Sequence, residues 1–158
     1  MKPQMSRASK MIRAPAEIIY RIIADYRHGH PNILPKPYFL SMDVEAGGYG
    51  AGTIVNFEMR LLGQRQAFHS LITEPEPGRL LVETDLRSGI PTSFHVIPTG
   101  NKDETQVTIS TELKGINPIQ SFLAKMLLQR VYNEELKLLA KFAEEQARFA
   151  QLSIVQNT

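Results

Sequence analysis

The feature that most constrains this chain is a long stretch of alternating residues that leads directly into one long amphipathic helix. Between positions 38 and 113, apolar and polar side chains alternate in short segments, for example Phe57 and Met59 against Asn56 and Glu58. A period of two places successive side chains on opposite faces of a strand. Turns rich in glycine and proline interrupt the stretch at short intervals, which favours an antiparallel meander over parallel βαβ units.

A strand and a short helix are predicted before this stretch. The strand is expected near residues 7–12, and the helix begins at Pro15 and keeps helical spacing of its apolar residues as far as Tyr26. Prolines recur between His30 and Pro37. They limit this connection to a bend or, at most, one helical turn.

The long helix is predicted to run from about Pro118 to Phe149, with the residues from Ser153 onward frayed. At about 1.5 Å per residue it is long enough to cross a whole sheet. Sheet and helix are each apolar on one side, so they must bury those sides against each other. We therefore expect an α+β domain with a curved antiparallel sheet of six to seven strands around the C-terminal helix. The predicted apolar stripe of this helix is Ile119, Phe122, Leu123, Met126, Leu127, Val131, Leu138, Leu139 and Phe142.

Composition narrows the classes of protein and of site. The 158 residues are 42% hydrophobic and 22% charged, which favours one globular domain over residues 1–158 with its core at about 5–148. A net charge of +2 with no dense basic run predicts no nucleic-acid partner. There is no cysteine, and His28 and His30 lack further ligands at a fixed spacing. No metal and no cofactor are therefore predicted.

No apolar run approaches the ~18–20 residues that span a bilayer. The N-terminal segment also lacks the apolar stretch of a secretory signal. The sequence therefore predicts no transmembrane segment and a cytoplasmic location.

Several short motifs carry a resemblance to a known family. They are IRAPAE at 12–17, IADY at 23–26, ITEPEPGR at 72–79, TSFHV at 92–96 and TQVTI at 105–109. Together with the order of elements, they resemble the START-like helix-grip (SRPBCC) superfamily, in particular its polyketide cyclase/dehydrase branch. The resemblance implies a helix-grip fold with a pocket for a hydrophobic ligand. Its members include binders, transfer proteins, cyclases and chaperone regulators, so it does not select an activity.

One row of side chains is predicted to face the long helix across a pocket. We expect Glu58, Glu83 and Glu112 on the opposite, solvated face, because a buried unpaired carboxylate is costly. The alternative is that the facing row packs into a filled core without a cavity. The predicted ligand-binding residues are Met42, Phe57, Met59, Phe68, Val82, Thr84, Phe94, Val96 and Ile109 from the sheet, with Phe122 and Met126 from the helix.

Catalytic residues are not indicated by any motif. No serine, histidine and carboxylate stand at the spacing of a hydrolytic triad. The glycines between Gly47 and Gly52 precede a strand rather than a helix, so they predict a turn and not a phosphate-binding loop. Only Tyr26, His30 and Tyr38, which are expected near the pocket mouth, are candidates for proton transfer.

Three functions follow from these predictions. The first is a carrier or sensor that binds a hydrophobic or aromatic small molecule, such as a lipid, without chemistry. The alternative is a polyketide cyclase/dehydratase-like enzyme that uses the same pocket, since positioning can supply much of such a reaction's rate. The second alternative is a protein-interaction module that uses the long helix. The identity of the ligand, the occurrence of a reaction and the oligomeric state are left open by the sequence.

Overall fold

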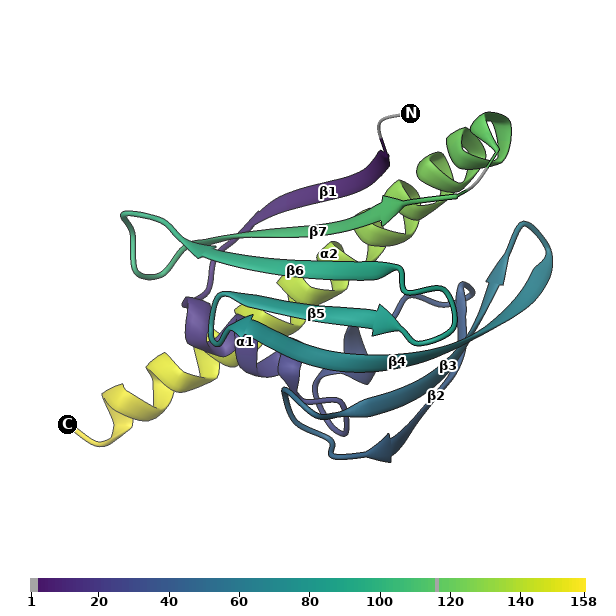
Figure 1. Cartoon of the computed structure of the whole chain (residues 1–158). Coiled ribbons are helices and arrows are strands. Elements are labelled where there is room, and N and C mark those ends of the chain that lie inside the picture. The colour runs from purple at the N-terminus through teal and green to yellow at the C-terminus, as the bar shows by residue number, and fades with distance from the viewer. Residues whose placement is uncertain (1–2, 116) are drawn as a thin grey trace.

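The computed structural model describes residues 3–115 and 117–158, and places them in one seven-stranded sheet with a long helix across it (Figure 1). The chain order of elements, with η1 a short 3₁₀ helix, is β1 (Gln4–Ile12), α1 (Ala16–Ala24), η1 (His30–Ile33), β2 (Phe39–Ala46), β3 (Ile54–Leu61), β4 (Gln64–Glu76), β5 (Leu80–Asp85), β6 (Pro91–Pro98), β7 (Thr105–Leu113) and α2 (Pro118–Gln156).

Every neighbouring pair of strands in the sheet is antiparallel. The strand order is β1-β7-β6-β5-β4-β3-β2, so β2 to β7 form a six-strand meander and β1 joins it at the far edge. The predicted α+β helix-grip arrangement is confirmed. The short 3₁₀ helix agrees with the limit of at most one helical turn expected for this connection.

The meander contains a tight hairpin turn between β3 and β4 and a glycine-rich loop between β2 and β3. Strands β3 and β4 meet in a two-residue turn in which Leu62 and Gly63 both have positive φ, at 52° and 75°. Such a turn matches the right-handed twist of a hairpin.

The glycine-rich loop after β2 is a turn, as predicted. It is attached to α1, because the Gly50 N–H donates to the Ala24 carbonyl oxygen at 3.0 Å and the Tyr26 N–H donates to the Gly48 carbonyl oxygen at 2.9 Å.

Helix α2 begins at a capped end and continues beyond the predicted end. The Asn117 side chain accepts a hydrogen bond from the Ile119 N–H at 2.9 Å, and Pro118 occupies the first turn. The helix runs to Gln156, so the predicted end at Phe149 and the fraying from Ser153 were wrong.

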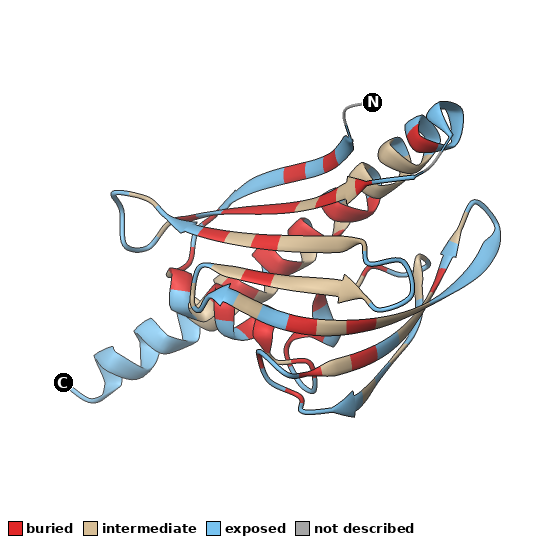
Figure 2. Cartoon of the chain, in the orientation of Figure 1, coloured by how far each residue is buried: buried red, intermediate tan, exposed pale blue. Residues whose placement is uncertain are grey.

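The two ends of α2 lie outside the core, as the pale blue turns in Figure 2 show. Phe122 and Met126 were predicted to face the sheet, but they are 57% and 54% exposed and face solvent instead. At this level the inward side of the helix carries Ala124, Leu127 and Leu128. With 39 residues, the helix is about 58 Å long, which is longer than it needs to be to cross the sheet. Part of its apolar stripe is therefore left in solvent.

Candidate functional site

A cavity of about 490 Å³ lies between the concave face of the sheet and the first half of α2. Its walls come from strands β2 to β7, from the segment around η1, and from the inward side of α2 between Gln120 and Glu135. Beyond Glu135 the same helix packs into the core through Leu136 and Leu139. The predicted alternative of a completely filled core was therefore wrong.

Five of the predicted ligand-binding residues line this cavity: Met42, Phe57, Met59, Phe68 and Phe94. Two of their aromatic rings contact each other, and a third ring extends the contact. Phe57 and Phe68 are stacked with ring centroids 5.2 Å apart, and Phe39, which also lines the cavity, lies 5.8 Å from Phe57. A ligand-binding role of these residues stays a prediction.

The other six predicted residues do not line the cavity. Phe122 and Met126 are exposed on α2, as described above. Val96 and Ile109 have the predicted orientation but are fully buried in the core, since α1 lies against this end of the sheet and contacts β6. Val82 and Thr84 lie on the opposite face of β5. Their neighbours Leu81, paired with the buried Phe94, and Glu83, paired with Thr92, point inward instead.

Glu83 is consequently a cavity residue, which corrects its predicted place on the solvated face. Its Oε1 accepts a hydrogen bond from the Tyr26 hydroxyl at 2.6 Å and lies 3.5 Å from His30 Nε2. Glu58 and Glu112 keep the predicted outward place, where they pair with Arg65 and Lys114. The side chain of Glu83 is 11% exposed, and its two polar neighbours reduce the cost of removing its carboxylate from water.

Two of the three candidate catalytic residues meet at Glu83. Tyr26 and His30 stack with ring centroids 4.4 Å apart, and Phe94 packs edge-on against His30 at 5.6 Å. Both candidates line the cavity, whereas Tyr38 packs half-buried against the core and does not. Complete burial, and then the neighbouring Glu83, raises the pKa of Tyr26 well above its ordinary value. Tyr26 therefore stays protonated and donates a hydrogen bond to Glu83.

The geometry also assigns the tautomer of His30. Its Nδ1 lies 2.7 Å from the backbone carbonyl oxygen of Ile23, and a carbonyl can only accept, so Nδ1 carries a proton. The side chain is almost completely buried. The second nitrogen, Nε2, faces Glu83 Oε1 at 3.5 Å.

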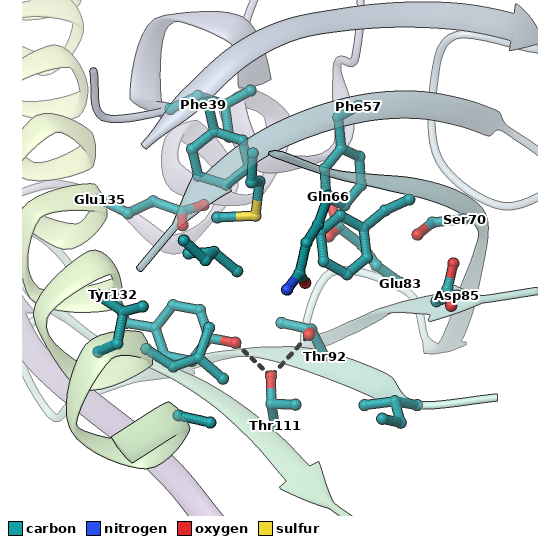
Figure 3. A pocket seen from close by; sticks show the side chains of 18 of the residues that line it. Phe39, Phe57, Gln66, Ser70, Glu83, Asp85, Thr92, Thr111, Tyr132 and Glu135 are labelled. Carbon is teal, nitrogen blue, oxygen red and sulfur yellow. Dashed lines mark hydrogen bonds between the residues drawn. The ribbon is translucent and has the colours of Figure 1, made fainter. Parts of the chain in front are cut away.

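A chain of hydroxyl groups forms another polar part of the wall. Thr92 Oγ1 and Thr111 Oγ1 lie 2.7 Å apart, and Thr111 is hydrogen-bonded in turn to the Tyr132 hydroxyl (Figure 3). Burial raises the pKa of Tyr132 to about 12, so this phenol is neutral. The chain can present a donor or an acceptor to a ligand, because each hydroxyl rotates.

Glu135 is the functional candidate that sequence reasoning missed. It projects from α2 toward the cavity, is only 2% exposed, and its Oε1 has no hydrogen-bond partner among the described residues (Figure 3). Burial, and then the charge of Glu83, raises its pKa well above the ordinary value. A signal was present in the sequence: Glu135 stands three residues after Tyr132 and four before Leu139, on the apolar side of the helix.

Within the described residues, no three histidine, cysteine or acidic side chains converge as metal ligands would. The same part of the chain contains no helix long and apolar enough to cross a membrane.

Solved structures of similar shape share the whole architecture. The solution structure of the KanY protein is 23% identical, with a TM-score of 0.80, and the match covers 91% of this chain and 99% of that one. The ZhuI aromatase/cyclase from Streptomyces sp. R1128 is 16% identical, with a TM-score of 0.76 and coverages of 94% and 98%. A START superfamily protein from Mycobacterium smegmatis is 18% identical, with a TM-score of 0.67 and coverages of 90% and 98%. At these identities the likeness shows the fold alone.

Comparison of the sequence with curated proteins gives no match. A family model does match, over residues 4–144, and its description is "Polyketide cyclase / dehydrase and lipid transport". This match covers β1 through most of α2, and therefore every element that builds the cavity. The chain belongs to the polyketide cyclase/dehydrase and lipid transport family.

Proposed function

We propose that this protein is a carrier or sensor that binds one mostly apolar small molecule in the cavity between its sheet and α2. The observation that carries this proposal is the cavity itself. Its volume of about 490 Å³ falls within the roughly 300–1,000 Å³ typical of small-molecule sites. Burial of an apolar ligand there would be driven by the hydrophobic effect, at about 25 cal/mol per Å² of apolar surface removed from water.

The arrangement of the walls favours a ligand with flat or aromatic parts. Phe39, Phe57 and Phe68 form a continuous aromatic surface on β2, β3 and β4. Aromatic rings prefer offset-stacked or edge-on partners, worth about 0.5–1.5 kcal/mol beyond the area they bury. The hydroxyl groups of Thr111 and Tyr132 on another part of the wall would orient a ligand by hydrogen bonds.

The proposal is tested with N-phenyl-1-naphthylamine, a neutral aromatic dye that fluoresces in apolar surroundings. The wild type should bind it at one site per chain. Phe57→Asp places an unpaired charge on the cavity wall and should weaken binding at least about tenfold. The matched control is Glu58→Gln, which changes the next residue on the outer face and should leave binding unchanged.

Circular dichroism must show that both variants are folded. Equal losses of dye binding in the two variants would contradict the assigned faces of β3. Failure of the folded wild type to bind the dye, or to retain any small molecule in native mass spectrometry after gentle purification, would overturn the proposal.

A second candidate function, a cyclase/dehydratase-like reaction in the same cavity, is favoured by the cluster of Tyr26, Glu83 and His30. These residues could move a proton to or from a bound polyketide, and positioning of the chain would supply much of the rate. Incubation with a linear poly-β-ketone thioester tests this function by mass spectrometry. An enzyme should convert the substrate into a product that has lost water, and Glu83→Gln should slow the conversion. A substrate that is bound but recovered unchanged supports the carrier.

A lipid is one class of ligand that would suit the apolar walls, and the family description includes lipid transport. Lipid binding, a cytoplasmic location and the absence of a nucleic-acid partner stay predictions from the sequence.

A further inference from the structure

The charges around the cavity are unbalanced. Three acidic side chains line it, Glu83, Asp85 and Glu135, whereas His30 is the single side chain among the described lining residues that can become a cation. No lysine or arginine is among those lining residues. In an otherwise apolar cavity, acidic side chains therefore outnumber basic ones. Such a lining favours a ligand that carries a positive charge or hydrogen-bond donors.

Two of the three acids are already satisfied by the protein. Asp85 accepts hydrogen bonds from the Ser88 hydroxyl at 2.7 Å and from the backbone N–H groups of Ser88 and His69 at 2.9 and 3.1 Å. Glu83 accepts from Tyr26 and faces His30. Neither acid depends on a ligand for a partner.

Glu135 differs from both, because the fold gives its Oε1 no donor. It extends into the cavity from α2 near Tyr132, whose hydroxyl is bonded to Thr111 instead (Figure 3). An acceptor that is buried without a partner costs about 1–3 kcal/mol, more when it is charged. A site that keeps such a group on its wall can recover that cost when a donor arrives with a ligand.

We infer that the ligand carries a protonated amine on an apolar skeleton, and that its ammonium group binds to Glu135. The inference rests on the proposed function of the cavity. An ammonium group supplies hydrogen-bond donors and a positive charge, and charge-assisted hydrogen bonds are roughly twice as strong as neutral ones. The charge of Glu83, which acts on Glu135, favours a cation further. A ligand carboxylate would meet a lining with three acids and only His30 in return.

Protons must balance in this binding reaction. The raised pKa of Glu135 favours its neutral form in the free protein. When R–NH₃⁺ binds, the carboxyl proton of Glu135 leaves to the buffer, and the resulting carboxylate pairs with the ammonium group. The other titratable groups on this side of the cavity, Tyr26, His30, Glu83 and Tyr132, keep their hydrogen-bond partners. Binding of an amine should therefore release a proton, and binding of a neutral alcohol should not.

The test uses three ligands with one aromatic part: 2-(2-naphthyl)ethylamine, 2-(2-naphthyl)ethanol and 2-naphthylacetate. Each is titrated calorimetrically at pH 7 in two buffers of different ionisation enthalpy, which measures proton release. The wild type should bind the amine at least about tenfold more tightly than the alcohol, and the acetate most weakly. Only amine binding should change its apparent enthalpy with the buffer.

Two adjacent variants separate the role of Glu135 from a general effect of charge. Glu135→Gln should reduce the preference for the amine over the alcohol to less than about threefold and abolish proton release. It should lose far less affinity for the alcohol than for the amine, and circular dichroism must show that it is folded. Glu134→Gln is the matched control, since Glu134 lies on the outer side of α2 and pairs with Lys137 at 3.0 Å. It should behave like the wild type.

The outcomes separate this inference from the proposed function. Equal affinity of the wild type for the amine and the alcohol would overturn the amine ligand and leave the binding function standing. A preference for the amine that persists in Glu135→Gln would overturn the assignment to Glu135. Failure of all three ligands and of the naphthylamine dye to bind the folded wild type would remove both.

Discussion

The inner face of the sheet is solid at one level and hollow at the next, although the same strands build both. Near α1 the inward residues are fully buried in the core: Ile72, Leu81, Val96 and Ile109. At the next inward position along each strand, the inward residues line the cavity: Ser70, Glu83, Phe94 and Thr111. The boundary crosses the sheet diagonally, because Ile72 pairs with Glu83 and Leu81 pairs with Phe94. On α2 the same boundary falls between Glu135, which lines the cavity, and Leu136, which is buried in the core.

The difference is made by what covers the sheet rather than by the strands themselves. Helix α1 lies on the solid level and contacts both β6 and α2. Beyond the reach of α1, helix α2 crosses the concave face (Figure 1), and the cavity lies between this part of α2 and the sheet. Alternation along a strand decides which side chains face inward, and a separate covering element decides whether they form a core or a cavity.

The largest expected effect is on stability at the solid level. Leu139→Ala removes a fully buried side chain of α2 and should lower the free energy of unfolding by about 2–5 kcal/mol. Leu128→Ala shortens a side chain that borders the existing cavity and should cost less than half as much. Urea denaturation of the two variants measures both costs. Equal costs would show that the hollow level is as tightly packed as the solid one.

The next effect concerns pH at the hollow level. The pKa of Glu135 is raised in the folded state above its ordinary value of 4.5, so folding binds its proton more tightly. Its contribution to stability is fully present below pH 4.5 and is lost as the pH rises toward the folded-state pKa. The loss is at most about 1.4 kcal/mol for each pH unit.

Glu135→Gln should remove this dependence. The difference in unfolding free energy between the variant and the wild type should therefore change in favour of the variant as the pH rises from 4.5. Denaturation at a series of pH values measures the difference. A difference that stays constant with pH would mean that Glu135 is not sequestered from water.

A smaller effect is expected from the hydroxyl chain. Tyr132→Phe removes the phenol that bonds to Thr111 and should cost about 0.5–1.5 kcal/mol, because Thr111 keeps its bond to Thr92. Denaturation at neutral pH measures this cost. A loss comparable with that of Leu139→Ala would show that the chain supports the cavity wall as a whole.

The smallest effect is expected at the exposed end of α2. Met126→Ala should change the unfolding free energy by less than about 0.5 kcal/mol, because the side chain is 54% exposed. A much larger loss, measured in the same urea titration, would place Met126 against the sheet as the stripe predicted. An unchanged stability together with loss of self-association or partner binding would favour the protein-interaction alternative.

The order of elements was predictable because each has a simple periodic pattern. The inward face of β5 was not, since its sequence LLVETD begins with three consecutive apolar residues and both assignments of alternation fit it. Pairing with β4 and β6 decides the face, and this information is not local. The stripe of α2 was misplaced for a similar reason. Its first turns are apolar on more than one side, and only the tertiary structure shows which side the sheet covers.

The candidate site was predictable in part. The aromatic row was found from alternation alone. Glu83 was assigned to the wrong face and the buried Glu135 was missed, because carboxylates are rarely buried without partners. The partners of Glu83 are Tyr26, just after α1, and His30 in η1, both far away in the sequence. Glu135 Oε1 has no hydrogen-bond partner among the described residues, and this unpaired acceptor is the feature that points to a ligand group.

The pairing of β1 with β7 has a consequence for the order of folding. Residues Gln4–Ile12 find their partners in Leu113–Thr105, near the other end of the sheet-forming sequence. During synthesis, β1 leaves the ribosome well before the strand that will pair with it. Its backbone N–H and carbonyl groups therefore remain without strand partners until β7 has been made. Closing so long a loop is entropically costly and slows folding. The meander β2 to β7 contains only local pairings, so it is the unit expected to form first, with β1 added last.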